Sequence, residues 1–181
     1  MRTRIMSMAL IAGAALTPVV GRAQSSLAFQ IGGGAVAPSG DLGTYAKTGW
    51  IGHVGITKPL GRNPRIAFQA SAFYAHTSHD GTAGEATNIP GVGGGLLYQL
   101  KTAATVRPYV SGLVGVLQHR YDAGSTEYGS DYGSESETKA FVGVGGGLTF
   151  HRVFVDARYV AASGTSFIPI TVGMRFGRAA K

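Results

Sequence analysis

The sequence predicts an all-β fold, an eight-stranded antiparallel up-and-down β-barrel that spans a membrane. One observation is a glycine-rich segment, Gly91–Tyr98, which returns as Gly143–Phe150 and more loosely as Gln30–Ala37. A second is that apolar and small or polar residues alternate with a period of two in stretches of about 8 to 13 residues. A third is that the connections between these stretches alternate between short and long, as in transmembrane barrels.

The composition supports a single bilayer-embedded domain. The chain has 181 residues, which suits one domain. Glycine contributes 29 of them, and charged residues are only 14%, against about 25% in soluble domains. A membrane barrel tolerates this composition because one face of each strand meets lipid. The absence of cysteine excludes disulfides, thiolate chemistry and a lipoprotein anchor.

The N-terminal segment Met1–Ala23 predicts a cleaved signal peptide. Arg2 and Arg4 form a basic start, Met6–Val20 is apolar, and small residues precede a cut after Ala23. The apolar run is shorter than the ~20 residues that a spanning helix needs. We therefore expect an exported chain in which Gln24–Lys181 forms the barrel domain. Loss of Arg2, Arg4 and Arg22 leaves 13 cations and 9 anions, a net charge of +4 rather than +7.

Period-two alternation defines eight predicted strands. In the segment 107–119, Tyr109, Leu113 and Leu117 compete with Val110, Val114 and Val116 for the apolar face, so its register stays open. Because an unpaired edge cannot face hydrocarbon, the last strand must pair with the first. The predicted strands are Leu27–Ala37, Gly49–Lys58, Arg65–His76, Ile89–Leu100, Arg107–His119, Lys139–Phe150, Val153–Val160 and Ile168–Phe176.

The connections fall into two groups by length. The long ones follow the Pro38-Ser39-Gly40-Asp41 break and then cover Thr77–Asn88, Arg120–Thr138 and Ala161–Phe167. The short ones are Pro59–Pro64, Lys101–Val106 and His151-Arg152.

Aromatic and charged residues sort along the predicted barrel. Outward aromatics gather in two girdles, as in lipid-embedded barrels. One girdle contains Phe29, Phe68, Tyr98, Phe150 and Phe176, with Tyr109 if the fifth strand takes that register, and the other contains Trp50, Tyr74 and Tyr159. Eight acids lie in the long connections: Asp41, Asp80, Glu85, Asp122, Glu127, Asp131, Glu135 and Glu137. The ninth, Asp156, is an inward strand position, and most cations lie in or beside the short turns or in the C-terminal tail.

These features resemble the small eight-stranded bacterial outer-membrane β-barrel family, which includes OmpA-like transmembrane domains, OmpX-like and opacity-type porin-like proteins. The resemblance covers nearly all of the mature chain and is carried by Val92–Leu100, by Arg107-Pro108-Tyr109-Val110 and by the closing strand. Thr171, Gly173 and Phe176 match the family's signal for the assembly machinery, although Gly177–Lys181 follow the aromatic residue. The resemblance implies an outer-membrane location, with membrane lipid, lipopolysaccharide and the assembly machinery as partners.

Two interpretations of the barrel interior remain open. Eight strands leave a lumen just wide enough for side chains to fill. One interpretation is a plug of hydrogen bonds and ion pairs in which an arginine compensates Asp156, and the other is a narrow passive pore for small solutes. The predicted lumen residues are Gln30, His53, Thr57, Arg65, Gln69, Ser71, Gln99, Thr149, Asp156, Arg158, Thr171 and Arg175.

Three motifs near the long connections suggest chemistry. His76-Thr77-Ser78 resembles the His-x-Ser pair of outer-membrane lipid A deacylases, with Glu85 or Asp80 to orient the base. His76-x-x-His79-Asp80 is a poor preformed metal site. The tyrosines in the third long connection, Tyr121, Tyr128 and Tyr132, are suited to adaptable recognition.

We expect a monomeric membrane barrel with a structural or surface-interaction role and long acidic extracellular loops. We assign no catalytic, cofactor-binding or metal-binding residues and expect no enzyme activity. Cations do not interleave with aromatics in a patch, so nucleic acid is not an expected partner. The alternatives are the narrow pore, a lipid A-modifying enzyme and a soluble exported barrel with an apolar ligand cavity.

Overall fold

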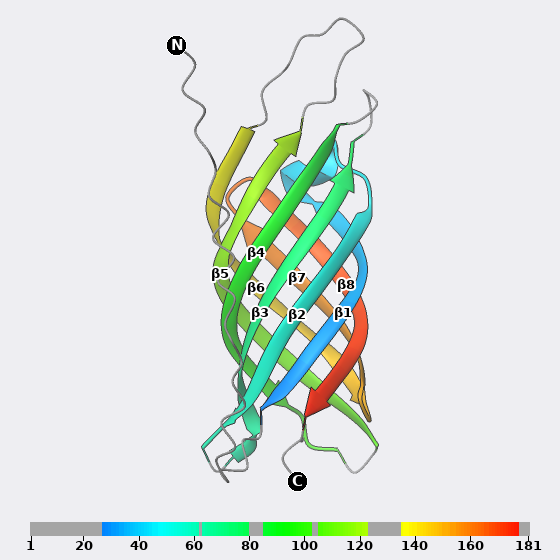
Figure 1. The fold of residues 1–181 in the computed structure, drawn as a ribbon, viewed down its shortest axis with the longest axis vertical. Coiled ribbons are helices and arrows are strands. Elements are labelled where there is room, and N and C mark those ends of the chain that lie inside the picture. The colour runs from blue at the N-terminus through cyan, green and yellow to red at the C-terminus, as the bar shows by residue number, and fades with distance from the viewer. Residues whose placement is uncertain (1–26, 62, 80–84, 103–104, 123–134, 178–181) are drawn as a thin grey trace, which may run out of the picture.

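Eight antiparallel strands close into one barrel in the computed structural model, with β8 paired to β1 (Figure 1). The structure describes residues 27–61, 63–79, 85–102, 105–122 and 135–177, so the predicted signal peptide lies outside the described residues. The elements are β1 (Ala28–Ser39), the 3-10 helix η1 (Gly40–Thr44), β2 (Gly49–Leu60), β3 (Asn63–Ser78), β4 (Ala86–Gln99), β5 (Val106–Asp122), β6 (Glu135–Phe150), β7 (Val153–Ala162) and β8 (Thr165–Gly177). The predicted fold class and the pairing of the last strand with the first are confirmed.

The two ends of the barrel differ, and we name them by their connections. The turn end holds the start of β1, the end of β8 and the two-residue His151-Arg152 turn, in which His151 has a positive φ of 54°. The loop end holds η1, His79 and Glu85, and lies at the top of Figure 1. All strands run between these two ends with a strong tilt (Figure 1), as closure of a barrel requires.

Strands β3 to β6 continue beyond the apolar wall at the loop end. They contain 16, 14, 17 and 16 residues, whereas a tilted strand crosses a bilayer in about 9 to 11. Thr77 pairs with Thr87, and His119 with Glu137. The predicted connections Thr77–Asn88 and Arg120–Thr138 are therefore wrong at both of their ends, because β-branched and aromatic residues there extend the ladders. Residues 80–84 and 123–134 lie outside the described part.

The prediction for the last long connection is also wrong. The predicted loop Ala161–Phe167 is a tight turn of Ser163-Gly164, and Thr165, Ser166 and Phe167 already pair with β7. Gly164 has a φ of 64°, the left-handed conformation that a two-residue hairpin turn needs and glycine supplies at low cost. The predicted alternation of short and long connections is therefore broken between β7 and β8.

The outward face of every strand is apolar over its middle part, and the structure resolves the open register of β5. Val110, Val114 and Val116 are 48%, 63% and 48% exposed, whereas Tyr109 and Leu113 are buried inside the barrel. Tyr109 therefore does not belong to the girdle. The other predicted girdle residues are exposed on the outer wall: Phe29, Phe68, Tyr98, Phe150 and Phe176 towards the turn end and Trp50, Tyr74 and Tyr159 towards the loop end. None of the helical residues that the structure describes forms a helix of membrane-spanning length and apolarity.

The glycine repeats make room for large inward side chains. A Cβ added at Gly93 would lie 2.8 Å from Cζ of Phe141, and one at Gly91 would collide with the ring of Phe73. In the second repeat, a Cβ at Gly147 would lie 2.7 Å from the hydroxyl of Tyr109. Gly94 instead faces lipid, where its nearest neighbour is Phe68 at 3.4 Å. The repeats thus thin the inner wall where aromatic residues cross the lumen.

Candidate functional site

The loop-end half of the lumen is filled by apolar side chains, which we call the apolar layer. The ring of Phe73 meets Phe141 edge-to-face at 5.7 Å between centroids, and meets Phe167 at 6.2 Å. The apolar layer is absent from the sequence prediction, which placed only polar residues in the lumen. Ile51 and Phe141 fall on inward positions of their predicted strands, and this was the signal that could have identified the layer. The layer consists of Val36, Leu42, Ile51, Ala75, Ile89, Leu113, Leu117, Phe141, Val160 and Phe167, none of them more than 6% exposed.

The turn-end half of the lumen holds most of the buried polar side chains, together with Phe154 and a small cluster of Ala67, Leu97 and Tyr109, and we call it the polar layer. Most predicted lumen residues lie here. Gln30, Thr57, Gln69, Thr149, Asp156 and Thr171 are buried, whereas His53, Ser71, Gln99, Arg158 and Arg175 are partly buried. Arg65 is exposed at the mouth of the turn end. The structure adds Tyr109 and Ser111 from β5, which the open register had left unassigned.

Asp156 is the centre of the polar layer. Its Oδ1 lies 2.7 Å from Nε of Arg158 in an ion pair, and its Oδ2 accepts a hydrogen bond of 2.9 Å from the Tyr109 hydroxyl. The predicted compensation of Asp156 by an arginine is therefore confirmed. Arg175 donates to Oε1 of Gln30 at 3.4 Å, and its guanidinium carbon lies 5.9 Å from the centroid of the Tyr109 ring. The Asp156 carboxylate is thus held with a charged partner, as its desolvation requires.

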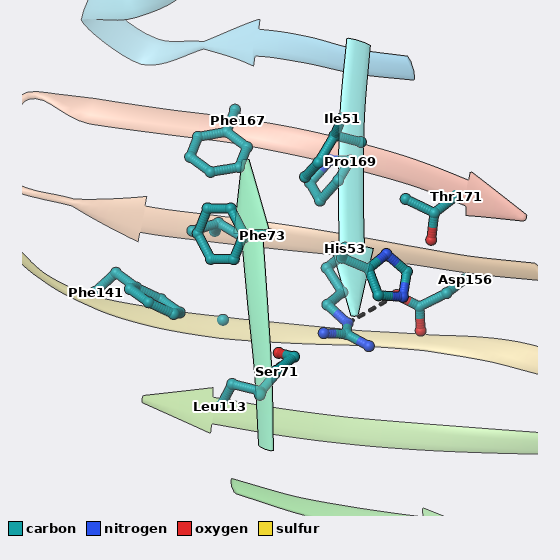
Figure 2. A pocket seen from close by; sticks show the side chains of 13 residues that line it. Ile51, His53, Ser71, Phe73, Leu113, Phe141, Asp156, Phe167, Pro169 and Thr171 are labelled. Atoms are coloured by element: carbon teal, nitrogen blue, oxygen red, sulfur yellow. Dashed lines mark ion pairs between the residues drawn. The ribbon is translucent and has the colours of Figure 1, made fainter. Parts of the chain in front are cut away.

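A small cavity separates the two layers. Figure 2 shows Phe73, Phe141 and Phe167 on one side of it, and His53, Asp156 and Thr171 on the other. The space open to the centres of water molecules is about 30 Å³. That volume holds one or two waters and is far too small for an organic ligand.

Residues of the first and second loop-end connections cap the barrel above the apolar layer. Leu42 of η1 is fully buried in that layer, and Ala46 forms a β-bridge with His79. His79 also bonds through Nε2 to Oγ1 of Thr87 at 2.8 Å, and its ring contacts Tyr45 and Tyr121 at 5.1 and 5.3 Å between centroids. Burial lowers the pKa of the His79 imidazole below its ordinary 6.5, although the nearby Glu85 carboxylate opposes this.

The His-x-Ser and metal motifs do not assemble into a site. Nδ1 of His76 lies 2.8 Å from Oδ1 of Asn88, which also accepts a bond from the Tyr74 hydroxyl, and the His76 ring lies 5.8 Å from that of Trp50. Among the described residues no hydrogen bond joins His76 to Ser78. His76 points outwards and His79 inwards, so they lie on opposite faces of the sheet and cannot share a metal. Asp80, like Tyr128 and Tyr132, lies outside the described residues.

Comparisons with known proteins identify the fold. No protein-family model matches the chain, and no curated protein sequence matches it. The crystal structure of Neisserial surface protein A matches with a TM-score of 0.63 and 16% identity, over 85% of this chain and 98% of that one. Ail, the attachment invasion locus protein of Yersinia pestis, solved in complex with the heparin analogue sucrose octasulfate, matches with a TM-score of 0.53 and 14% identity, over 83% and 99% of the two chains. The chain therefore has the fold of the small eight-stranded outer-membrane β-barrels.

Proposed function

We propose that this protein is a monomeric outer-membrane surface protein, a plugged barrel that presents an acidic loop end to the outside and binds cationic partners there. The apolar layer carries this proposal. A lumen filled by side chains no more than 6% exposed offers no route for solutes, which leaves recognition to the loop end. Export through the predicted signal peptide, Met1–Ala23, and the shared fold support the location.

The charge distribution of the loop end indicates the sign of the partner's charge. Acidic residues outnumber cations in the segments that form the loop-end connections. These segments are residues 40–48, 77–88 and 118–139, and their only cations in the sequence are Lys47, Arg120 and Lys139. Lys139 is paired with Glu137 at 3.1 Å, so this pair adds no net charge to the loop end. Surfaces with one predominant charge steer and retain partners of the opposite charge. The acids of these segments are Asp41, Asp80, Glu85, Asp122, Glu127, Asp131, Glu135 and Glu137.

The turn end has the opposite charge and cannot compete for the same partner. Its connections and the C-terminal segment carry cations and no acids. Ail was solved with a sulfated heparin analogue, which is a polyanion. The acidic loop end of this chain favours a partner of the opposite charge, a polycation. The turn-end and C-terminal cations are Lys58, Arg62, Arg65, Lys101, Arg107, Arg152, Arg178 and Lys181.

Binding to the purified barrel in nanodiscs of neutral lipid tests the proposal. We expect fluorescent polylysine to bind, with an affinity that falls as salt rises, because exposed charges are screened. The double variant Glu85→Gln/Glu137→Gln should weaken binding, whereas Lys101→Gln at the turn end, the matched control, should not. Preferential binding of heparin or sucrose octasulfate, or equal polylysine affinity in the Glu variant and the native protein, contradicts the proposal.

The outer wall supports the expected membrane partners. Trp50, Tyr74, His76 and Asn88 form a polar and aromatic cluster on the outward face at the loop end, where lipopolysaccharide head groups would contact the barrel. β8 presents Phe176 outwards for the assembly machinery. The contacts of His76 with Asn88 and Trp50 place it in this cluster rather than in a deacylase site. His76→Ala is therefore expected to leave lipid A acylation unchanged, as judged by mass spectrometry of extracted lipid A.

A further inference from the structure

The polar layer holds more positive than negative charge. Among the described inward positions in the turn-end half of the barrel, Asp156 is the single carboxylate, whereas Arg158 and Arg175 are both cations. Arg65 and Arg107 add two more cations at the mouth below. A surplus of charge in a lumen of low dielectric favours a counter-ion.

Asp156 does not neutralise this surplus. Its two oxygens are taken by Arg158 at 2.7 Å and by the Tyr109 hydroxyl at 2.9 Å. Arg175 meets neutral groups in its described contacts, namely the Gln30 amide oxygen and the Tyr109 ring. One positive charge of the polar layer therefore has no counter-charge in contact with it among the described residues.

Hydrogen-bond donors gather at the cavity between the layers. Arg158, His53, Ser71 and Thr171 line it together with Asp156 (Figure 2). Nε2 of His53 and Oγ1 of Thr171 are buried and have no hydrogen-bond partner, and Thr171 is only 4% exposed. Buried polar atoms are normally paired, so these two groups leave places for a partner in the cavity, and each can donate a hydrogen bond to an acceptor there. Across the cavity, Phe73, Phe141 and Phe167 present apolar walls that provide no competing acceptor.

The volume of the cavity limits that ligand. About 30 Å³ open to water centres admits one small ion and excludes sulfated sugars, nucleotides and other organic anions. The apolar layer lies between the cavity and the loop end.

We infer that this cavity binds a single small inorganic anion of the size of chloride, held by the Arg158 side chain, the His53 imidazole and the Thr171 hydroxyl. The ion compensates the surplus cation of the polar layer and accepts the hydrogen bonds that the protein itself leaves unmade. The site is a blind pocket rather than a step in conduction, and it is independent of the partner proposed for the loop end.

Halide-dependent stability tests the inference on the refolded barrel in detergent micelles. The thermal unfolding midpoint is measured at constant ionic strength while sodium gluconate, whose anion is too large for the cavity, is replaced by sodium chloride or bromide. We expect the native midpoint to rise and saturate with halide. Thr171→Val, which removes one donor to the ion and keeps the shape, should weaken the apparent halide affinity by about tenfold.

Thr149→Val is the matched control, because Thr149 is an equally buried hydroxyl without a partner but does not line the cavity. It should keep the native halide response. If Thr171→Val fails to fold, ³⁵Cl NMR of the native protein replaces it. Bound chloride broadens the ³⁵Cl resonance, and bromide that displaces it narrows the resonance again. Equal midpoints in gluconate and chloride mean that the cavity holds only water and overturn the inference, as does a Thr149→Val variant that loses the response while Thr171→Val keeps it.

Discussion

At the scale of single residues, the glycines of the two repeats divide by the face on which they lie. A Cβ at Gly93 would meet both Cζ of Phe141 at 2.8 Å and the carbonyl oxygen of Val114 at 2.9 Å. We expect Gly93→Val to destabilise the barrel by about 1 to 3 kcal/mol through overpacking. Gly94→Val, next in the chain but facing lipid, should cost far less. Urea unfolding in lipid vesicles measures both, and equal destabilisation by the two substitutions is the contrary result.

The Asp156 carboxylate makes a second residue-scale prediction. Asp156→Asn removes the charge that faces Arg158 and leaves the guanidinium without its carboxylate partner in the polar layer. Loss of one partner of a buried ion pair costs about 3 to 5 kcal/mol. Ser111→Ala, which removes a buried hydroxyl without a partner, serves as the control and should change stability little. The free energy of unfolding in vesicles distinguishes them, and a neutral Asp156→Asn would show that solvent already screens the pair.

Prediction of single residues from the sequence succeeded where the alternation of inward and outward positions agreed with the chemistry of the side chain. Asp156 lies on an inward position with Arg158 two residues later on the same face, so their pairing could be expected. Tyr109 could not be assigned, because apolar residues occupy both faces of β5. The apolar layer was missed for a related reason, since a phenylalanine such as Phe141 at an inward position was not weighed as lumen filling.

At the scale of elements, β5 tests the resolved register. Leu113 is 6% exposed in the apolar layer, and its neighbour Val114 is 63% exposed to lipid. We expect Leu113→Ala to cost about 2 to 5 kcal/mol, as for other buried leucines, because it opens a cavity inside the barrel. Val114→Ala should cost under about 1 kcal/mol, because lipid fills the space. Unfolding in vesicles provides the comparison, and the reverse order of the two costs requires the opposite register.

The cap around His79 has a predicted pH dependence. Burial lowers the folded-state pKa of His79 below 6.5, so the folded cap binds a proton less readily than the unfolded chain does. The stability contributed by neutral His79 is therefore present above pH 6.5 and is lost as pH falls below that value through the folded pKa. Hydrogen-exchange protection of the Lys47 amide, which donates to the Ser78 carbonyl at 2.7 Å, reports the cap.

Protection of the Lys47 amide should fall between pH 8 and pH 5. His79→Gln keeps a side chain that can hydrogen-bond to Thr87 but removes the titrating group, so this variant should lose the pH dependence. If protection in the native protein is the same at both pH values, or if the Gln variant remains pH-dependent, His79 does not control the cap.

Element-level prediction was accurate for strand number and order and inaccurate at the loop end. Period-two alternation identifies the part of a strand that crosses an apolar layer, because lipid and lumen impose opposite preferences on its two faces. Beyond the bilayer the outward face no longer meets lipid, and the inward face there can hold polar side chains. Thr77 and Thr87 pair in this region and are both fully buried, so the alternation of apolar and polar residues fades while strand pairing continues. Ser163-Gly164 did carry a turn signal, but the surrounding small and polar residues suggested a longer loop.

At the scale of the whole molecule, the barrel combines an apolar layer towards the loop end, a polar layer towards the turn end and a wall that is apolar over its bilayer-crossing part. Its fold matches Neisserial surface protein A at 16% identity. What the two chains can share at that identity is the pattern of alternation and closure rather than particular side chains. For this reason the sequence predicted the fold well, whereas the side chains that fill the lumen became clear only when strand tilt and register were known.

The measurement that tests the plugged barrel most directly is planar-bilayer conductance of the purified full-length protein, with a known porin in the same bilayer as the positive control. The apolar layer predicts no discrete current steps in either orientation or at either sign of voltage, because ions cannot cross a constriction filled by buried apolar side chains. Reproducible single-channel steps that scale with salt concentration would contradict the plugged lumen and restore the narrow pore as the function of this barrel.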